Sequence, residues 1–117
     1  MTNNAISGTL PSAIGDLTML TSMDYSTNFV TGTIPTTIGL LTQINTFAAT
    51  NNQHTGTIPT ELGLMTSLLT LRFDVNKLGG PIPTEIGNLK NVGRFMASED
   101  FEMSLDFSNV CLTLFLL

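Results

Sequence analysis

One phrase recurs four times at a fixed spacing of 24 residues, and this period restricts the fold of the chain more than any other feature. The phrase reads Gly-Thr-Leu-Pro, Gly-Thr-Ile-Pro twice and Gly-Pro-Ile-Pro, at residues 8–11, 32–35, 56–59 and 80–83. Pairs of an apolar residue and a glycine follow in the same register at residues 14–15, 38–39, 62–63 and 86–87. A fixed period in this range with a ladder of apolar positions is typical of a solenoid, in which each turn stacks on the next. We therefore predict about four stacked turns across residues 1–98.

A short alternating segment lies between successive copies of the phrase. Apolar or aromatic residues at every second position, such as Met23 with Tyr25 and Leu71 with Phe73, alternate with mostly polar neighbours. This alternation is the period of a strand with one buried face. We expect parallel strands near residues 22–26, 46–50, 70–74 and 94–98.

Three recurring residue types indicate where the chain turns. Glycine permits backbone conformations closed to other residues, proline fixes φ and removes an N–H donor, and asparagine bonds nearby backbone groups at turns. We interpret these residues as structural: Asn28, Asn52 and Asn76; Gly32, Gly56 and Gly80; Pro35, Pro59 and Pro83.

One full turn, read from Leu17, is L-x-x-L-x-x-M-x-Y-x-x-N-x-V-x-G-x-I-P-x-x-I-G-x-L. This pattern resembles the leucine-rich repeat family, and specifically its plant-type class with the G-x-I-P phrase, over roughly residues 4–98. The resemblance implies an α/β repeat solenoid that coils in a right-handed single layer. Each turn would carry a short parallel strand on a concave face, a second short strand near G-x-I, and a 3₁₀-like or irregular segment on the convex side.

Composition and charge narrow the classes of function. The chain has 117 residues, 42% of them hydrophobic and only 11% charged, so it is too apolar to be a disordered segment. The net charge is −5, but residues 1–98 are nearly neutral, with four basic and five acidic side chains. Nucleic-acid binding requires clustered lysine and arginine, which this chain lacks. We therefore expect no nucleic-acid partner.

The repeat pattern ends near residue 98. Residues 99–117 form a tail that is first acidic, with Glu99, Asp100, Glu102 and Asp106, and then apolar, ending in VCLTLFLL. These last eight residues are too few to span a bilayer. We expect them to form a C-terminal cap over the last turn, in preference to the start of a membrane segment. Neither end has a paired-cysteine cap, so we interpret residues 1–98 as a fragment of a longer repeat protein.

No arrangement of residues typical of catalysis or cofactor binding is found. The chain has a single histidine, His54, and a single cysteine, Cys111, and it lacks nucleotide-binding, metalloprotease and serine-hydrolase motifs. His54 occupies the repeat position of Val30 and Leu78, so we expect it in the core or at its rim. The sequence predicts no enzyme activity, no cofactor and no metal site.

The outward side chains of the predicted strands remain as a binding surface. A broad, shallow, mixed face suits protein or peptide recognition better than turnover of a small molecule. The leading hypothesis is a non-catalytic binding module, similar to the ectodomain of a plant-type receptor-like protein, with Arg72 contacting a carboxylate or a backbone carbonyl of a peptide. The expected face comprises Ser22, Asp24, Ser26, Thr46, Thr50, Thr70, Arg72, Asp74, Arg94 and Met96.

The resemblance also places the parent protein outside the cell or at a membrane, although this chain shows no signal peptide and no complete transmembrane segment. Further repeats of the same parent are a second expected partner. Two other functions stay open. The chain is a structural remnant with no partner of its own, or the pairs Thr31/Thr33 and Thr55/Thr57 form part of an ice-binding threonine array, which Gly79 and Pro81 interrupt.

Overall fold

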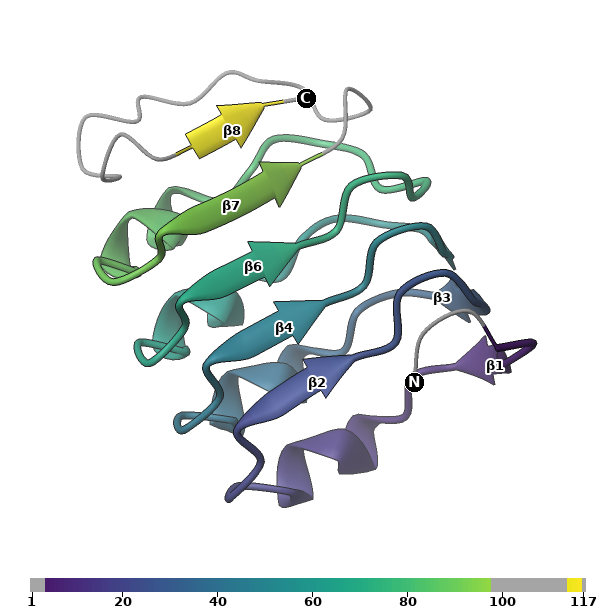
Figure 1. Cartoon of the computed structure of the whole chain (residues 1–117), viewed down its shortest axis with the longest axis horizontal. Coiled ribbons are helices and arrows are strands. Elements are labelled where there is room, and N and C mark those ends of the chain that lie inside the picture. The colour runs from purple at the N-terminus through teal and green to yellow at the C-terminus, as the bar shows by residue number, and fades with distance from the viewer. Residues whose placement is uncertain (1–3, 98–113, 117) are drawn as a thin grey trace.

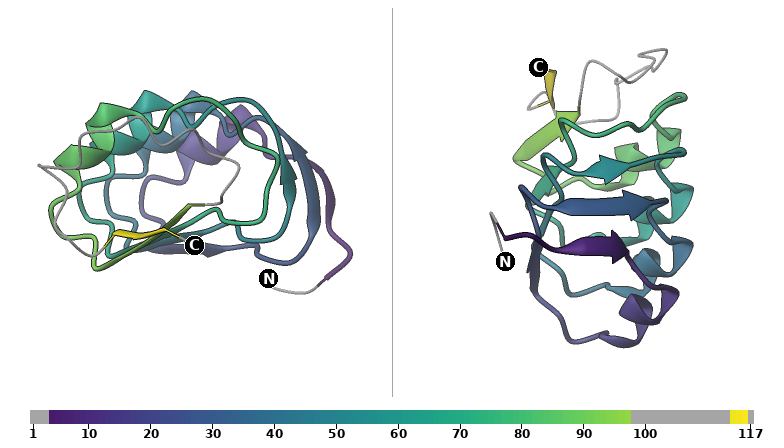
Figure 2. Two further views of the ribbon diagram at one scale, coloured as in Figure 1. Left: turned by 90° about the horizontal axis from the view of Figure 1, so that it is seen from above. Right: turned by 90° about the vertical axis from the view of Figure 1, so that its right-hand side faces the viewer.

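The computed structural model describes residues 4–97 and 114–116. Within them the chain winds as a coil whose successive turns lie side by side, with strands along one side and short helices along the opposite side (Figures 1 and 2). The order of elements repeats from turn to turn, as the sequence period predicts.

The larger sheet has five parallel strands in the order β2-β4-β6-β7-β8. Its members are β2 (Ser22–Asp24), β4 (Thr46–Ala48), β6 (Thr70–Arg72), β7 (Arg94–Ala97) and β8 (Leu114–Leu116). Ser22 pairs with Thr46, Thr46 with Thr70, and Thr70 with Arg94, so strand pairing follows the 24-residue period. The first three strands end two residues before the predicted boundary. They end early because the chain turns soon after each one: the third residue past each strand, Thr27, Asn51 or Val75, has a φ of 56–58°. After the first strand the backbone N–H of Ser26 also donates to the Asp24 carboxylate at 3.0 Å.

The smaller sheet has three parallel strands: β1 (Ser7–Thr9), β3 (Phe29–Gly32) and β5 (Gln53–His54). Strand β3 ends at Gly32 of the G-x-I phrase, and β5 ends before Gly56, so neither strand follows the glycine. Strand pairing in the smaller sheet does not follow the 24-residue period. Thr9 lies opposite Thr31, and Thr31 lies opposite Gln53, so paired residues are 22 positions apart. The remaining side of the coil carries 3₁₀ helices η1 (Ser12–Asp16), η2 (Thr36–Leu40), η3 (Thr60–Leu64) and η4 (Thr84–Asn88).

Proline starts each 3₁₀ helix. Pro35, Pro59 and Pro83 are N-cap residues with φ between −69° and −61°, and each carbonyl accepts the N–H of the residue three positions later. The fixed ring therefore sets the direction of the chain where it leaves the smaller sheet, at a position where a missing N–H breaks no hydrogen bond.

The core fills the space between the two sheets and the 3₁₀ helices. Within the described residues it is continuous from Tyr25 to Val92 and includes a row of edge-to-face aromatic contacts: Tyr25 with Phe47 at 5.9 Å and Phe47 with Phe73 at 6.4 Å between ring centroids. His54 is 0% exposed and belongs to this interior, at the repeat position of the buried Val30 and Leu78.

Part of the predicted tail joins the larger sheet. Strand β8 pairs in parallel with β7, with Phe95 opposite Leu114 and Ala97 opposite Leu116. Residues 98–113, which contain the acidic run, lie outside the described residues. The cap hypothesis for residues 99–117 therefore stays a prediction, supported by the pairing of β8.

Candidate binding surface

We use the name strand face for the outward surface of β2, β4 and β6 together with the residues that follow each strand. Strand pairing aligns Asp24, Ala48, Arg72 and Met96 in one column, beside the column of Ser22, Thr46, Thr70 and Arg94. The third predicted column, Ser26, Thr50 and Asp74, follows the strands, and the Thr50 hydroxyl donates to Asp74 Oδ1 at 2.9 Å. For Arg94 and Met96 the structure describes only the backbone, and strand pairing assigns them to these two columns.

The predicted face residues differ in how far they reach solvent. Ser22 and Asp24 are exposed, and Ser26, Thr46, Thr50, Thr70 and Arg72 are half-buried. Asp74, in contrast, is only 8% exposed. Ala48, at the centre of the face, is 4% exposed, because its single methyl group lies between the longer side chains of Asp24 and Arg72 in the same column. The strand face is therefore most recessed at Ala48, which is the low point of this surface.

A small charged cluster surrounds this low point. Arg72 Nε lies 3.8 Å from Asp74 Oδ1, beyond hydrogen-bond distance, and this buried nitrogen makes no hydrogen bond among the described residues. Asp24 lies across Ala48 from Arg72. Burial raises the pKa of Asp24, but the hydrogen bonds from the Ser26 backbone and hydroxyl, together with the charge of Arg72, outweigh it and leave this pKa below 3.8. The Asp24 carboxylate is therefore ionised near neutral pH.

The turn that carries β6 differs from its neighbours at both ends of the strand. Leu69 and Val75 are 52% and 57% exposed, whereas one turn earlier the equivalent positions hold Asn45 and Asn51. Sequence reasoning missed these two residues because it read only the alternating strand positions. A comparison of every position with its equivalent 24 residues away would have found them.

The asparagine side chains lie beneath the turn at the end of this face and make structural hydrogen bonds. Asn52 Nδ2 donates to the carbonyls of Ala49 at 3.2 Å and Tyr25 at 3.1 Å, and its Oδ1 accepts the Val30 N–H at 3.0 Å. Asn28 and Asn76 repeat this pattern, with Oδ1 accepting from Ile6 and His54. Each of these amides ties its own turn to the one before it.

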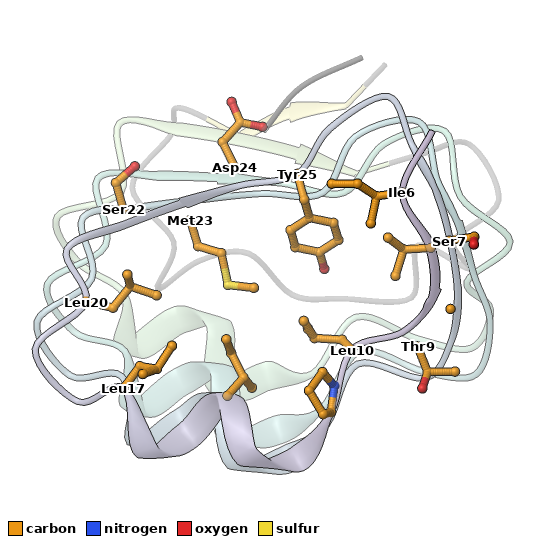
Figure 3. A pocket seen from close by; sticks show the side chains of 14 residues that line it. Ile6, Ser7, Thr9, Leu10, Leu17, Leu20, Ser22, Met23, Asp24 and Tyr25 are labelled. Atoms are coloured by element: carbon orange, nitrogen blue, oxygen red, sulfur yellow. The ribbon is translucent and has the colours of Figure 1, made fainter. Parts of the chain in front are cut away.

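A hollow lies at the first turn (Figure 3). It has a volume of about 580 Å³ and a mostly apolar lining that includes Leu10, Ile14, Leu20 and Met23. These residues are partly buried and lie one period before buried core residues of the next turn. In Figure 3 Met23 and Tyr25 point into this space, while Asp24 points away from it. The hollow is therefore the open side of the core at this end of the coil.

The threonine pairs lie along the smaller sheet and the residues that follow it. Thr33, Thr55 and Thr57 are exposed and Thr31 is half-buried. In residues 4–97 and 114–116, no helix is long and apolar enough to cross a membrane. No cluster of three or more histidine, cysteine or acidic side chains suited to a metal ion occurs in the same residues.

Comparison with known proteins shows that this fold is similar to the folds of receptor ectodomains. No protein-family model and no curated protein sequence matches the chain. Solved structures do. One is the leucine-rich repeat ectodomain of the Arabidopsis thaliana membrane receptor kinase GASSHO1/SCHENGEN3, in complex with CASPARIAN STRIP INTEGRITY FACTOR 2. It is 33% identical to this chain with a TM-score of 0.81. The match covers 86% of this chain and 12% of the receptor chain.

Two further structures give the same result. The plant peptide hormone receptor RGFR1 in complex with RGF2 is 35% identical with a TM-score of 0.81, covering 86% of this chain and 16% of the receptor. The BIR2 ectodomain from Arabidopsis thaliana is 28% identical with a TM-score of 0.81, covering 88% of this chain and 54% of that one. The chain thus spans about one eighth to one half of the length of these proteins. The similarities show a leucine-rich repeat solenoid and support the leucine-rich repeat family.

Proposed function

We propose that the chain is a non-catalytic protein- or peptide-binding module of the plant-type G-x-I-P class, and part of a receptor-like ectodomain. The similar structures support this proposal, because two of them are receptors in complex with CASPARIAN STRIP INTEGRITY FACTOR 2 and with RGF2. We also propose an extracellular location for the parent protein, which the same similarity supports. Further repeats of the parent would cover the ends of the coil.

The observation that carries the proposal is the composition of the turn with β6. Its outward positions hold Leu69, Arg72 and Val75, where the preceding turn holds asparagine, alanine and asparagine. Exposed leucine and valine contribute nothing to the core, and the arginine between them is a residue type that is enriched at binding hot spots. We place the centre of recognition at this turn.

Arg72 is the central polar contact of the proposed site. Asp74 lies beside its Nε, and the guanidinium has further N–H donors on a side chain that is 33% exposed. These donors bind a carboxylate or a backbone carbonyl of an extended peptide. Asp24, Thr46, Thr50 and Thr70 surround Arg72 on the same face and add hydrogen bonds, and Ala48 leaves room for the peptide backbone.

The test uses peptides selected from a random display library on the immobilised chain. Arg72→Ala should weaken the selected peptides about fivefold or more, equivalent to about 1 kcal/mol, while the free energy of unfolding stays within ~0.5 kcal/mol of the parent. Thr36→Ala and Glu61→Ala, on η2 and η3 across the coil from the larger sheet, are the matched controls. Affinity that survives Arg72→Ala but falls with either control would place the site on the 3₁₀ side. A library that yields no binder would favour the structural-remnant hypothesis.

A further inference from the structure

His54 is the only histidine of the chain, and it is fully buried at a position where the other turns carry aliphatic residues. Its Nδ1 lies 3.0 Å from the carbonyl oxygen of Gly32, and its Nε2 lies 2.9 Å from the hydroxyl of Tyr25. A carbonyl oxygen only accepts, so Nδ1 carries the proton of the neutral ring. Nε2 is then the acceptor, and the Tyr25 hydroxyl donates to it. The two hydrogen bonds tie His54 to the turn before it.

Among residues 4–97 and 114–116, the surroundings of this pair contain no charge that would stabilise an imidazolium. Strand β3, which holds Gly32, and the ring of Phe47, which contacts Tyr25, contain no titratable group. Tyr25 itself titrates, and its pKa is raised by burial. Asp24, which precedes Tyr25 in sequence, lies on the outward surface of β2. Lys77 donates its backbone N–H to the His54 carbonyl, and its side chain is exposed. None of the hydrogen bonds or ion pairs of the described residues joins His54 to a carboxylate.

We propose that His54 and Tyr25 form a pH-sensitive latch between adjacent turns, which opens the N-terminal part of the coil when His54 is protonated. A proton on Nε2 turns this acceptor into a donor, so the phenolic hydrogen of Tyr25 must rotate away into the apolar core. The imidazolium would also be buried without a counter-charge, which is costly. Opening brings the ring to water and removes both penalties.

The direction of the effect follows from linkage. Burial lowers the pKa of His54 below its ordinary 6.5, although the hydrogen bond with Gly32 raises it in part. The folded state therefore binds a proton less readily than the opened state. Stability is fully present above pH 6.5 and decreases as the pH falls from 6.5 to the folded-state pKa, below which the loss stops growing. In this window the opening constant rises by about tenfold for each pH unit.

The latch is positioned to affect the strand face. Tyr25 directly follows Asp24 of β2, and its N–H donates to the Ala48 carbonyl at 3.1 Å. A turn of a solenoid contacts only its neighbours, so loosening at Tyr25 need not spread to the turn with β6. Met23 and Leu20 beside Tyr25 are only partly buried, and a region with few buried apolar contacts opens more readily than a fully packed one.

The first measurement is a proton NMR titration of the single imidazole. The latch requires a His54 pKa below 6.5 in the folded chain. A value at or above 6.5 would overturn the proposal, because protonation would then not weaken the fold. No variant is needed for this measurement, and the resonance is unambiguous because the chain has one histidine.

The second measurement is amide hydrogen exchange at pH 7.5 and pH 5.0, corrected for intrinsic rates. In the parent chain, protection of residues 22–32 should fall at the lower pH, by about tenfold for each pH unit between 6.5 and the folded-state pKa, while residues 60–89 change less. His54→Leu places the residue of the equivalent Leu78 at this site and should lose the pH response. Equal loss of protection in parent and variant would contradict the latch. Tyr25→Phe should weaken the response without abolishing it, because the hydroxyl that must rotate is lost while the ring would still be buried without a counter-charge.

Discussion

Val75 has a left-handed backbone, with a φ of 56°, although it is β-branched. Such residues rarely adopt this conformation, which costs roughly 1–2 kcal/mol. The equivalent position one turn earlier holds Asn51 with a φ of 58°, a residue type that tolerates it. We predict that Val75→Asn raises the free energy of unfolding by about 1 kcal/mol in urea denaturation. Asn51→Val, the reverse change, should lower it by a similar amount. No gain for Val75→Asn would mean that this turn is not strained.

Gly56 has a φ of 80°, and a Cβ added there would lie 2.9 Å from Cγ2 of Thr33 in the preceding turn. Gly56→Val therefore introduces both backbone strain and a steric clash, and we expect it to destabilise the chain by more than about 2 kcal/mol. Thr57→Val keeps the methyl group that lies over Gly80 and changes only an exposed hydroxyl, so it should stay within ~0.5 kcal/mol. Equal melting temperatures for the two variants would show that the glycine is not required by the turn.

At the scale of elements, the asparagines substitute for the backbone hydrogen bonds that the turns lack. Asn52→Ala leaves the N–H of Val30 without its acceptor, and the Ala49 and Tyr25 carbonyls without a donor from this amide. The two carbonyls keep the amide donors of Asn76 and Asn28, whereas the Val30 N–H is left unpaired. A buried unpaired group costs about 1–3 kcal/mol, so we expect a loss of about 2 kcal/mol in chemical denaturation. Asn45→Ala, at an exposed position, is the control and should change stability by less than ~0.5 kcal/mol. Similar losses for both variants would contradict the structural role of Asn52.

The elements themselves were largely predictable from the sequence. The alternation around residues 23 and 47 predicted the parallel strands, and the register of the larger sheet follows from the repeat. The strand ends were not predictable, because hydrogen bonds such as that from Ser26 to the Asp24 side chain decide where a strand stops. The offset register of the smaller sheet was also missed. The glycine-centred turn sets this register, and no side-chain pattern records it.

The strand face was predictable by position but not by accessibility. The columns through Asp24 and Ser22 were expected from the period alone, and strand pairing places them in register. Burial of Asp74 and Ala48 depends on the size of the side chains in neighbouring turns, which a single strand pattern does not contain. The core position of His54 followed from its equivalents, whereas its bond with Tyr25 required the packing of two turns.

For the whole molecule, the central claim is that partners bind the strand face around β6 rather than the 3₁₀ side or the open end of the first turn. Hydrogen exchange with and without a peptide selected from the display library tests this claim most directly. We predict slower exchange in residues 69–76, with smaller changes in residues 45–52 and none in η2 and η3. Protection confined to residues 36–40 and 60–64, or to residues 10–23 around the open hollow, would contradict the account.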